Sequence, residues 1–347
     1  MSEDIGEFEE ADTLAGLHRI NERLQRQLRD AKDRSARMVE AAHQGACDAF
    51  LSLGKLPPVV APKSNHSPRT SNQKTRKPEV ALWHLTDWQG AKRTESYDST
   101  VMRERVLRFC DKATGITAIQ RRDHPVRECV ICFGGDMIEG LFQFPTQAFE
   151  IDQTIFGQYV TVSRLIVEVV RRALAAYDKV RVVAEWGNHG RIGSKRDSIP
   201  RSDNFDRMCY HLASELLENE PRLTWPDCPE DIQRIEIGNY RALLIHGDEI
   251  GRGGFASPNT IVQWVTRQQS GAYDWTFHDC YVGHYHRPQE WSLPAYGGRV
   301  FMSGSTESDN RYARDTMAAA SVPSQRLHFV DPDRGIVTAQ YVIWLDK

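Results

Sequence analysis

Five short apolar runs along the chain each end at a polar residue, and their length and composition predict strands. The runs cover residues 80–85, 129–135, 180–186, 240–245 and 280–283, and Gly or turn-forming residues bound them. Continuous apolar runs of this length are typical of strands that are buried on both faces, between layers of helix and sheet. The pattern therefore predicts an α/β fold with these strands in its interior.

Helical periodicity predicts the elements around these strands. Residues 13–52 contain no Pro and place most of their apolar side chains near one stripe, which predicts a long amphipathic helix before the first strand. Further helices are expected over 153–176 and 208–217. After the last run, 299–303 and 325–344 have the pattern of strands, and a hairpin turn divides the second segment. We expect both segments to complete a second sheet.

Composition divides the chain into three parts. Residues 1–53 hold an acidic tail and the amphipathic helix, 54–78 form a linker rich in Pro, Ser and basic residues, and 79–347 form the main domain. The helix either packs on its own main domain or joins two copies as a coiled coil. Because Gln27 and Ser35 interrupt its apolar seam, both interpretations stay open.

The linker carries a run of positive charge. From Lys63 to Lys77 the chain has five Lys or Arg residues, the two ends included, and no acid. A flexible basic tether of this kind can bind a nucleic-acid backbone, and a solvated linker without a partner is the alternative.

Overall composition narrows the class of protein. The 347 residues are enough for a large core, and the net charge of −3 excludes a chain that is polybasic as a whole. No apolar run has the length of a membrane span, and the acidic N-terminus is unlike a signal peptide. We therefore expect a cytoplasmic protein with no membrane partner. Seven scattered Cys indicate reduced thiols.

The polar residues at the ends of the apolar runs form a set that can bind metals. They are Asp87, Gln89, Asp136, Asn188, His189, His246, His284 and His286. Because ligands of open α/β sheets bind beyond the carboxyl ends of strands, we expect these side chains to converge on one rim. Oxygen donors mixed with imidazoles, without Cys, favour Mn²⁺, Fe or Zn²⁺ over a thiolate zinc site. Such a set can build a two-metal phosphoester-cleaving site, with Asp136 between the cations and His189 as general acid.

In this order, the motifs resemble those of the calcineurin-like metallophosphoesterase superfamily. The superfamily pattern of DxH, GDxx(D/E), GNH(D/E), H and GHxH is matched here by DWQ at 87–89, GDMIE at 135–139, GNHG at 187–190, His246 and GHYH at 283–286. The resemblance covers about residues 80–303, most of the chain. It implies a β-sandwich of two mixed sheets flanked by helices.

The resemblance also implies a role for each residue of the set. Carried over, one metal is held by Asp87, Gln89, Asp136 and His286, and the other by Asp136, Asn188, His246 and His284. Asp136 would bridge the two ions, and His189 would protonate the leaving oxygen. Two divalent cations are the implied cofactors, with Mn²⁺ expected and Zn²⁺, Fe or Mg²⁺ as alternatives.

Two positions depart from the superfamily pattern. Gln89 stands where the pattern has His, and its side-chain oxygen can bind Mn²⁺ or Mg²⁺ but is a weaker donor for softer ions. Gly190 stands where an acid usually follows Asn-His, so we expect the orientation of His189 to change. Neither departure removes a ligand of the second metal.

Basic residues close to the motifs are candidates for contacts with a phosphate substrate. Arg191, Lys195, Arg196 and Arg201 follow the Asn-His motif, and Arg287 follows His286. Basic residues this near a phosphate-cleaving centre favour substrate contacts over a random charge run. We expect Arg191 to take part in catalysis as well as in substrate binding.

The function expected from the sequence is metal-dependent hydrolysis of a phosphodiester, with DNA as the substrate. The motifs are most similar to those of SbcD-like and phage-type DNA repair exonucleases, and this similarity would also imply a partner ATPase. Hydrolysis of a nucleotide or another small phosphoester stays open, because fold does not choose the substrate. A binding scaffold with a weakened metal site is a third interpretation, raised by Gln89 and by the superfamily member in the retromer coat. The number of polar residues kept at the strand ends argues against it.

Overall fold

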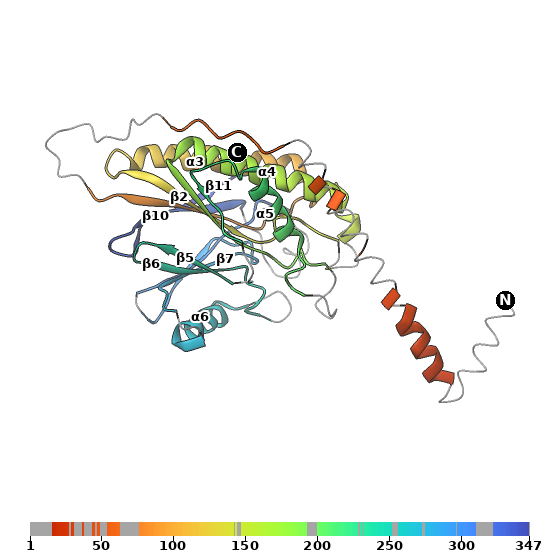
Figure 1. The fold of residues 1–347 in the computed structure, drawn as a ribbon. Coiled ribbons are helices and arrows are strands. Elements are labelled where there is room, and N and C mark those ends of the chain that lie inside the picture. Colours follow the sequence, from red (N-terminus) through yellow and green to blue (C-terminus); the bar gives the residue numbers. More distant parts are fainter. Residues whose placement is uncertain are drawn as a thin grey trace. The chain divides into compact units, whose positions relative to one another are not determined.

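The structure is a computed structural model, and it divides the chain into two compact units, 1–52 and 53–347. It describes residues 16–27, 29–30, 37, 44–45, 47–48, 54–62, 76–141, 143, 147–192, 200–227, 230, 232–251, 256–272, 275–295, 297–309 and 322–346. In the first unit, residues 16–27 are helical, and most of the remaining helix expected over 13–52 lies outside the described residues. The second unit contains both sheets (Figure 1).

The first sheet has six strands in the order β11-β10-β1-β2-β3-β4. Strands β1 to β4 run parallel, β10 pairs antiparallel with β1, and β11 pairs antiparallel with β10. All seven residues of β1 are buried, as the continuous apolar run predicts for a central strand. The strands are β1 (Glu79–Leu85), β2 (Val126–Gly134), β3 (Lys179–Glu185), β4 (Leu223–Thr224), β10 (Ser324–Asp331) and β11 (Ile336–Trp344).

The second sheet has five strands in the order β5-β6-β7-β9-β8. Its three central strands run parallel, and β5 and β8 are antiparallel at the edges. The strands are β5 (Ile232–Ile237), β6 (Tyr240–Ile245), β7 (Asp279–Val282), β8 (Gln289–Ser292) and β9 (Arg299–Met302). The expectation that 325–344 completes this sheet is wrong, because β10 lies beside β1 in the first sheet, with Val80 opposite Val330.

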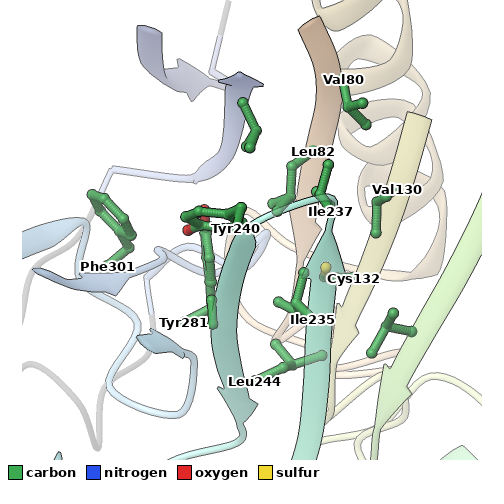
Figure 2. Packing of buried hydrophobic residues seen from close by; sticks show 13 residues of the cluster. Val80, Leu82, Val130, Cys132, Ile235, Ile237, Tyr240, Leu244, Tyr281 and Phe301 are labelled. Carbon is green, nitrogen blue, oxygen red and sulfur yellow. The ribbon is translucent and has the colours of Figure 1, made fainter. Parts of the chain in front are cut away.

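The apolar core lies between the two sheets (Figure 2). Val80, Leu82, Val130 and Cys132 from the first sheet pack in one cluster with Ile235, Ile237, Tyr240, Leu244, Tyr281 and Phe301 from the second. Cys129 is also buried but is outside this cluster, as expected for two strand residues that point to opposite faces. The described Cys residues are free thiols.

Helices cover the outer faces of both sheets. Contacts join α3 to β11 and α4 to β3 on the first sheet, and α6 to β8 on the second. Figure 1 shows α3 and α4 along the first sheet and α6 beside the second. The elements are α3 (Ser99–Gln120), η1 (Gln147–Phe149), α4 (Ile155–Ala176), α5 (Phe205–Leu216), α6 (Pro258–Arg267) and the short π-helix η2 (Gln268–Ala272). The expected α/β fold of two sheets flanked by helices is confirmed.

Capping residues explain where the predicted helices begin. Thr154 accepts a hydrogen bond from Gly157 N, so α4 starts at Ile155 within the expected segment. Asn204 accepts from Asp206 N and starts α5 three residues before the expected Met208. Among the described residues, no helix combines the length and apolarity that crossing a membrane requires.

Candidate metal centre

Contacts between the two sheets bring the polar strand ends together. Asp87, two residues after β1, accepts hydrogen bonds from His284 N through both carboxylate oxygens, at 3.0 and 2.9 Å. His246, directly after β6, lies with Nδ1 2.8 Å from Gly134 O at the end of β2. Because parallel strands end at the same edge of a sheet, these contacts place the polar ends of both sheets at one site.

The backbone of this site adopts an uncommon conformation at most of the expected ligands. Five of them have φ in the left-handed region, which non-Gly residues seldom enter. They are Asp87 (53°), Gln89 (48°), Asp136 (52°), His284 (66°) and His286 (55°). Backbone hydrogen bonds hold this geometry, including Asp87 N to Gly135 O at 2.9 Å and Gln89 N to Asp136 O at 3.0 Å. Such strain persists where the surrounding structure enforces it, and it clusters at functional sites.

Two glycines let the backbone approach the carboxylates. A Cβ atom at Gly187 would overlap the carboxylate of Asp136, and one at Gly283 would lie 2.6 Å from Asp87 Oδ2. Both positions therefore require a residue without a side chain. Gly187 in the Asn-His motif lets the ends of β2 and β3 approach within the first sheet, and Gly283 in the His-x-His motif lets the end of β7 approach the end of β1 in the other sheet.

Asp136 lies at the middle of the centre and is fully buried. Its Oδ2 is 3.1 Å from His246 Nε2, and its Oδ1 accepts from His189 N at 2.8 Å. Asp136, His246 and His284 offer ligand atoms that all lie within 4.8 Å of one another. Burial alone would raise the pKa of Asp136, but the neighbouring imidazoles hold it well below its usual range. Asp136 is thus an ionised carboxylate in contact with ligands from both sheets.

The histidines of the centre differ in charge because their neighbours differ. Burial lowers the pKa of His246, but Asp136 more than offsets this and raises it to about 10. Burial and the charge of His246 lower the pKa of His284 to about 3. His286 Nε2 lies 3.2 Å from Asp87 Oδ1, and its Nδ1 lies 2.8 Å from Glu307 Oε1. Although burial lowers the pKa of His286, Glu307 and Asp87 hold it well above its usual value.

The amide ligands provide a test of whether the centre suits cations. Gln89 Nε2 donates to Asp136 Oδ2 at 3.3 Å and lies 3.4 Å from His286 Nε2. Within the part of the chain that the structure describes, the buried oxygens Gln89 Oε1 and Asn188 Oδ1 have no hydrogen-bond partner. A buried oxygen without a partner costs about 1–3 kcal/mol, and a cation would satisfy it. The oxygen and imidazole donors therefore fit two divalent cations.

His189 borders the centre and is held by groups outside the expected ligand set. Its Nδ1 lies 3.0 Å from Glu139 O and 3.3 Å from Glu139 Oε2, and its Nε2 lies 3.9 Å from Asp136 Oδ2. Gln147 Nε2 donates to Glu139 O at 2.6 Å. Burial lowers the pKa of His189, but Asp136 and Glu139 raise it to about 9. His189 can therefore carry a proton at neutral pH.

The structure describes only some of the basic residues that are expected to contact the substrate. Arg191 is buried, and its Nη2 donates to Asp248 Oδ2 at 2.6 Å, which ties the Asn188 loop to the His246 loop. Arg201 lies 3.5 Å from Asp248 and 3.2 Å from Glu249. Arg287 is half-buried directly after His286. Lys195 and Arg196 lie outside the described residues.

Sequence reasoning missed several groups that support the ligands. The carboxylate of Asp206 accepts hydrogen bonds from Met137 N, Ile138 N and Gly187 N, and so fixes the loops of Asp136 and Asn188. Burial and the charge of Asp136 raise the pKa of Asp206 to about 6. The helix-capping pattern at 204–206 was a signal for this residue. Glu307, which supports His286, stands in a loop without a recognisable signal.

No family model and no curated protein matches the sequence. In three dimensions the chain is similar to Vps29 from Entamoeba histolytica in complex with Zn²⁺, with 13% identity over 77% of this chain and 99% of that chain and a TM-score of 0.35. It is also similar to a predicted phosphoesterase from Streptococcus pneumoniae, with 11% identity over 76% and 98% and a TM-score of 0.31. A phosphopantetheinyl hydrolase from Mycobacterium tuberculosis shows 13% identity over 75% and 99% and a TM-score of 0.31. Similarity at this level assigns no activity.

Proposed function

We propose that the protein is a two-metal-dependent phosphodiester hydrolase that acts on DNA. The observation that carries this proposal is the contact between carboxylates and imidazoles from two sheets, at Asp87, Asp136, His246, His284 and His286, together with two buried amide oxygens that have no hydrogen-bond partner within the described residues. A polar cluster of this kind would destabilise a protein that had no cation to place there. This argument also disfavours a scaffold without metal.

Each role in the proposed reaction can be assigned to residues of this chain. Asp87, Gln89, Asp136 and His286 would hold one cation, and Asp136, Asn188, His246 and His284 would hold the other. Bound there, the cations would supply charge that clamps the phosphate and favours attack by water. The Nε2 atom of His189 faces the centre, where it can give a proton to the leaving oxygen. Arg191 is fixed beside the centre and can take up charge on the phosphate.

Three arginines around the centre support a polyanionic substrate. Arg201 is exposed, Arg287 is half-buried and Arg191 is held between two ligand loops. Arg201 and Arg287 can contact phosphates on either side of the one that is cleaved. We propose Mn²⁺ as the cation because oxygen donors form four of the seven ligands.

A small phosphoester is the second candidate substrate, and one observation favours it. Asp248 and Glu249 lie beside Arg191 and Arg201 and neutralise much of their charge. A small substrate needs fewer positive contacts than a nucleic-acid backbone does. Salt separates the two, because affinity for DNA falls steeply with salt concentration and affinity for a small ester falls far less.

The first experiment measures hydrolysis of a linear DNA duplex, a single strand and bis-p-nitrophenyl phosphate, with and without Mn²⁺. Asp136→Ala serves as the control for contaminating activity. Mn²⁺-dependent DNA cleavage that the variant lacks would support the nuclease. Cleavage of bis-p-nitrophenyl phosphate alone would favour the small substrate, and no turnover with any divalent metal would overturn both.

A second variant tests the proposed general acid. His189→Ala removes the proton donor but no proposed metal ligand, so the protein should keep its cations. Turnover of DNA should fall by about 10²–10⁴-fold, the usual contribution of general acid catalysis. Metal content and rate are measured on the same preparation. A wild-type rate in this variant would show that His189 is not the acid.

A further inference from the structure

We infer that Lys92 is a positioning residue for His189: its ammonium group fixes Glu139, and Glu139 orients the imidazole that protonates the leaving oxygen. This inference rests on the proposed phosphoester hydrolysis. Lys92 follows three residues after Gln89, and Lys92 N donates to Gln89 O at 2.8 Å. The loop that carries a proposed metal ligand therefore also carries the lysine.

Lys92 is a buried cation between two carboxylates. Its Nζ lies 3.2 Å from Glu139 Oε1 and 2.8 Å from Glu150 Oε2, and only 8% of the residue is exposed. Burial lowers the pKa of Lys92, but Glu139 and Glu150 more than offset this and hold it above its ordinary value. A buried charge of this kind is stable only when it is paired, so Lys92 and Glu139 restrain each other.

Glu139 connects the lysine to His189. One carboxylate oxygen of Glu139 faces Lys92, and the other lies 3.3 Å from His189 Nδ1. Gln147 Nε2 holds Glu139 from another side, at 2.6 Å from its backbone oxygen and 3.2 Å from Oε1. Glu139 N also donates to Gly90 O at 2.9 Å. Glu139 is thus held through its backbone and its Oε1. Its backbone oxygen, 3.0 Å from His189 Nδ1, and its Oε2 both face that nitrogen, which leaves His189 Nε2 for the reacting oxygen.

The residue after His189 explains why this support is needed. Position 190 is Gly, and a Cβ atom there would overlap Asn204 Oδ1, so no acidic side chain fits. Asn204 in turn donates to Gly187 O at 2.8 Å and caps α5, so moving it aside would break both interactions. The orientation of His189 therefore depends on Glu139, and the position of Glu139 depends on Lys92.

The choice of leaving group separates positioning of an acid from general structural support. An alkoxide needs a proton as the P–O bond breaks, whereas p-nitrophenolate departs without one. Lys92→Met should therefore lower kcat for the dinucleotide TpT by roughly 10–100-fold, the scale seen when an orienting partner is removed. Its kcat for bis-p-nitrophenyl phosphate and its KM for both substrates should stay near wild type. Lys92→Arg, which keeps the charge, should recover part of the loss.

Two comparisons control this experiment. Lys179→Met removes the same charge from an exposed lysine at the start of β3, away from the centre, and should leave both rates unchanged. Glu139→Gln should show the same selective loss as Lys92→Met, and the double variant should lose little more, because both changes break one chain of contacts. Should Lys92→Met not fold, Lys92→Gln takes its place. Equal loss on both substrates, or loss on neither, would overturn the inference.

A second readout does not depend on turnover. In the metal-free protein, the NMR signal of the His189 Nδ1 proton should be protected from exchange, and His189→Gln identifies it by its absence. Because the backbone oxygen of Glu139 also faces Nδ1, exchange of this proton should stay slow in Lys92→Arg and become faster in Lys92→Met and Glu139→Gln. Unchanged exchange in Lys92→Met would show that Lys92 does not position His189. If the wild type hydrolyses neither probe, the proposed function is wrong, and this signal still decides the role of Lys92.

Discussion

The two sheets contribute different chemistry to the metal centre. The first sheet supplies oxygen ligands after β1, β2 and β3, and the second supplies imidazoles after β6 and β7: Asp87, Gln89, Asp136 and Asn188 on one side, and His246, His284 and His286 on the other. His246 and His286 contact carboxylates of the first sheet, while two amide oxygens have no partner in the described structure. Imidazole–carboxylate pairs thus join the sheets without a cation, whereas the two amide oxygens are left for a cation to satisfy.

The largest effect is expected at Asp136, where ligands from the two sheets meet. Asp136→Asn keeps the shape of the side chain but removes the charge that both ligand sets share. Binding of both cations should be lost, and turnover should fall roughly thousandfold or more, because the cations supply several kcal/mol of stabilisation. Metal analysis of the purified variant and rates on DNA test this. Two retained cations would show that Asp136 does not bridge them.

The next prediction compares the stability effect of one ligand from each sheet, in protein stripped of metal by a chelator. His246→Leu leaves Asp136 buried beside fewer positive groups and should destabilise the fold by about 3–5 kcal/mol. Asn188→Leu removes an oxygen that already lacks a partner, so unfolding free energy should change by no more than about 1 kcal/mol. Urea unfolding of both variants and the wild type measures the difference.

Adding Mn²⁺ is the control for the comparison of the two variants in metal-free protein. With Mn²⁺ present, the wild type should gain stability, because a ligand that binds only the folded state shifts the equilibrium toward it. Asn188→Leu should gain much less, although its metal-free stability is near wild type. Equal gains in the two proteins would mean that Asn188 is not a ligand.

These contrasts show which parts of the centre could be predicted from sequence. Asp136 and His246 were predictable because each ends an apolar strand, and strand ends meet at one edge of a sheet. Lys92 and Glu307 were not, because a loop residue far along the chain becomes a neighbour only through the fold. The assignment of β10 to the second sheet failed for a similar reason: the residue pattern predicts a strand, but the partner strand depends on where the chain returns.

A smaller effect is expected at Gln89, the position where an amide oxygen replaces an imidazole. Gln89→His would make the donors of the first sheet more like those of the second. Affinity for Zn²⁺ relative to Mg²⁺ should rise on the order of tenfold, the scale of changes around a metal ligand. Calorimetric titration of each ion into wild type and variant measures the ratio. An unchanged ratio would exclude Gln89 from the ligand set.

The last contrast concerns a histidine that lies between the sheets but outside the centre. His84 lies 2.8 Å from Ser303 Oγ, and burial and Arg326 lower its pKa from 6.5 to about 3. This is the opposite of His246, whose pKa Asp136 raises, so the neighbouring charge decides the protonation state of a buried histidine. Because the unfolded chain binds the proton first, the contribution of neutral His84 to stability is complete above pH 6.5. It is lost progressively as the pH falls toward about 3.

His84→Gln should therefore make the fold less sensitive to acid, even if it lowers stability at neutral pH. Between pH 6.5 and about 3, the slope of unfolding free energy against pH should decrease by one proton, about 1.4 kcal/mol per pH unit. Urea unfolding at several pH values in metal-free protein gives the slopes for wild type and variant. Parallel slopes would mean that His84 is already protonated in the fold. The contrast between His84 and His246 would then fail, because both histidines would carry charge whatever their neighbours.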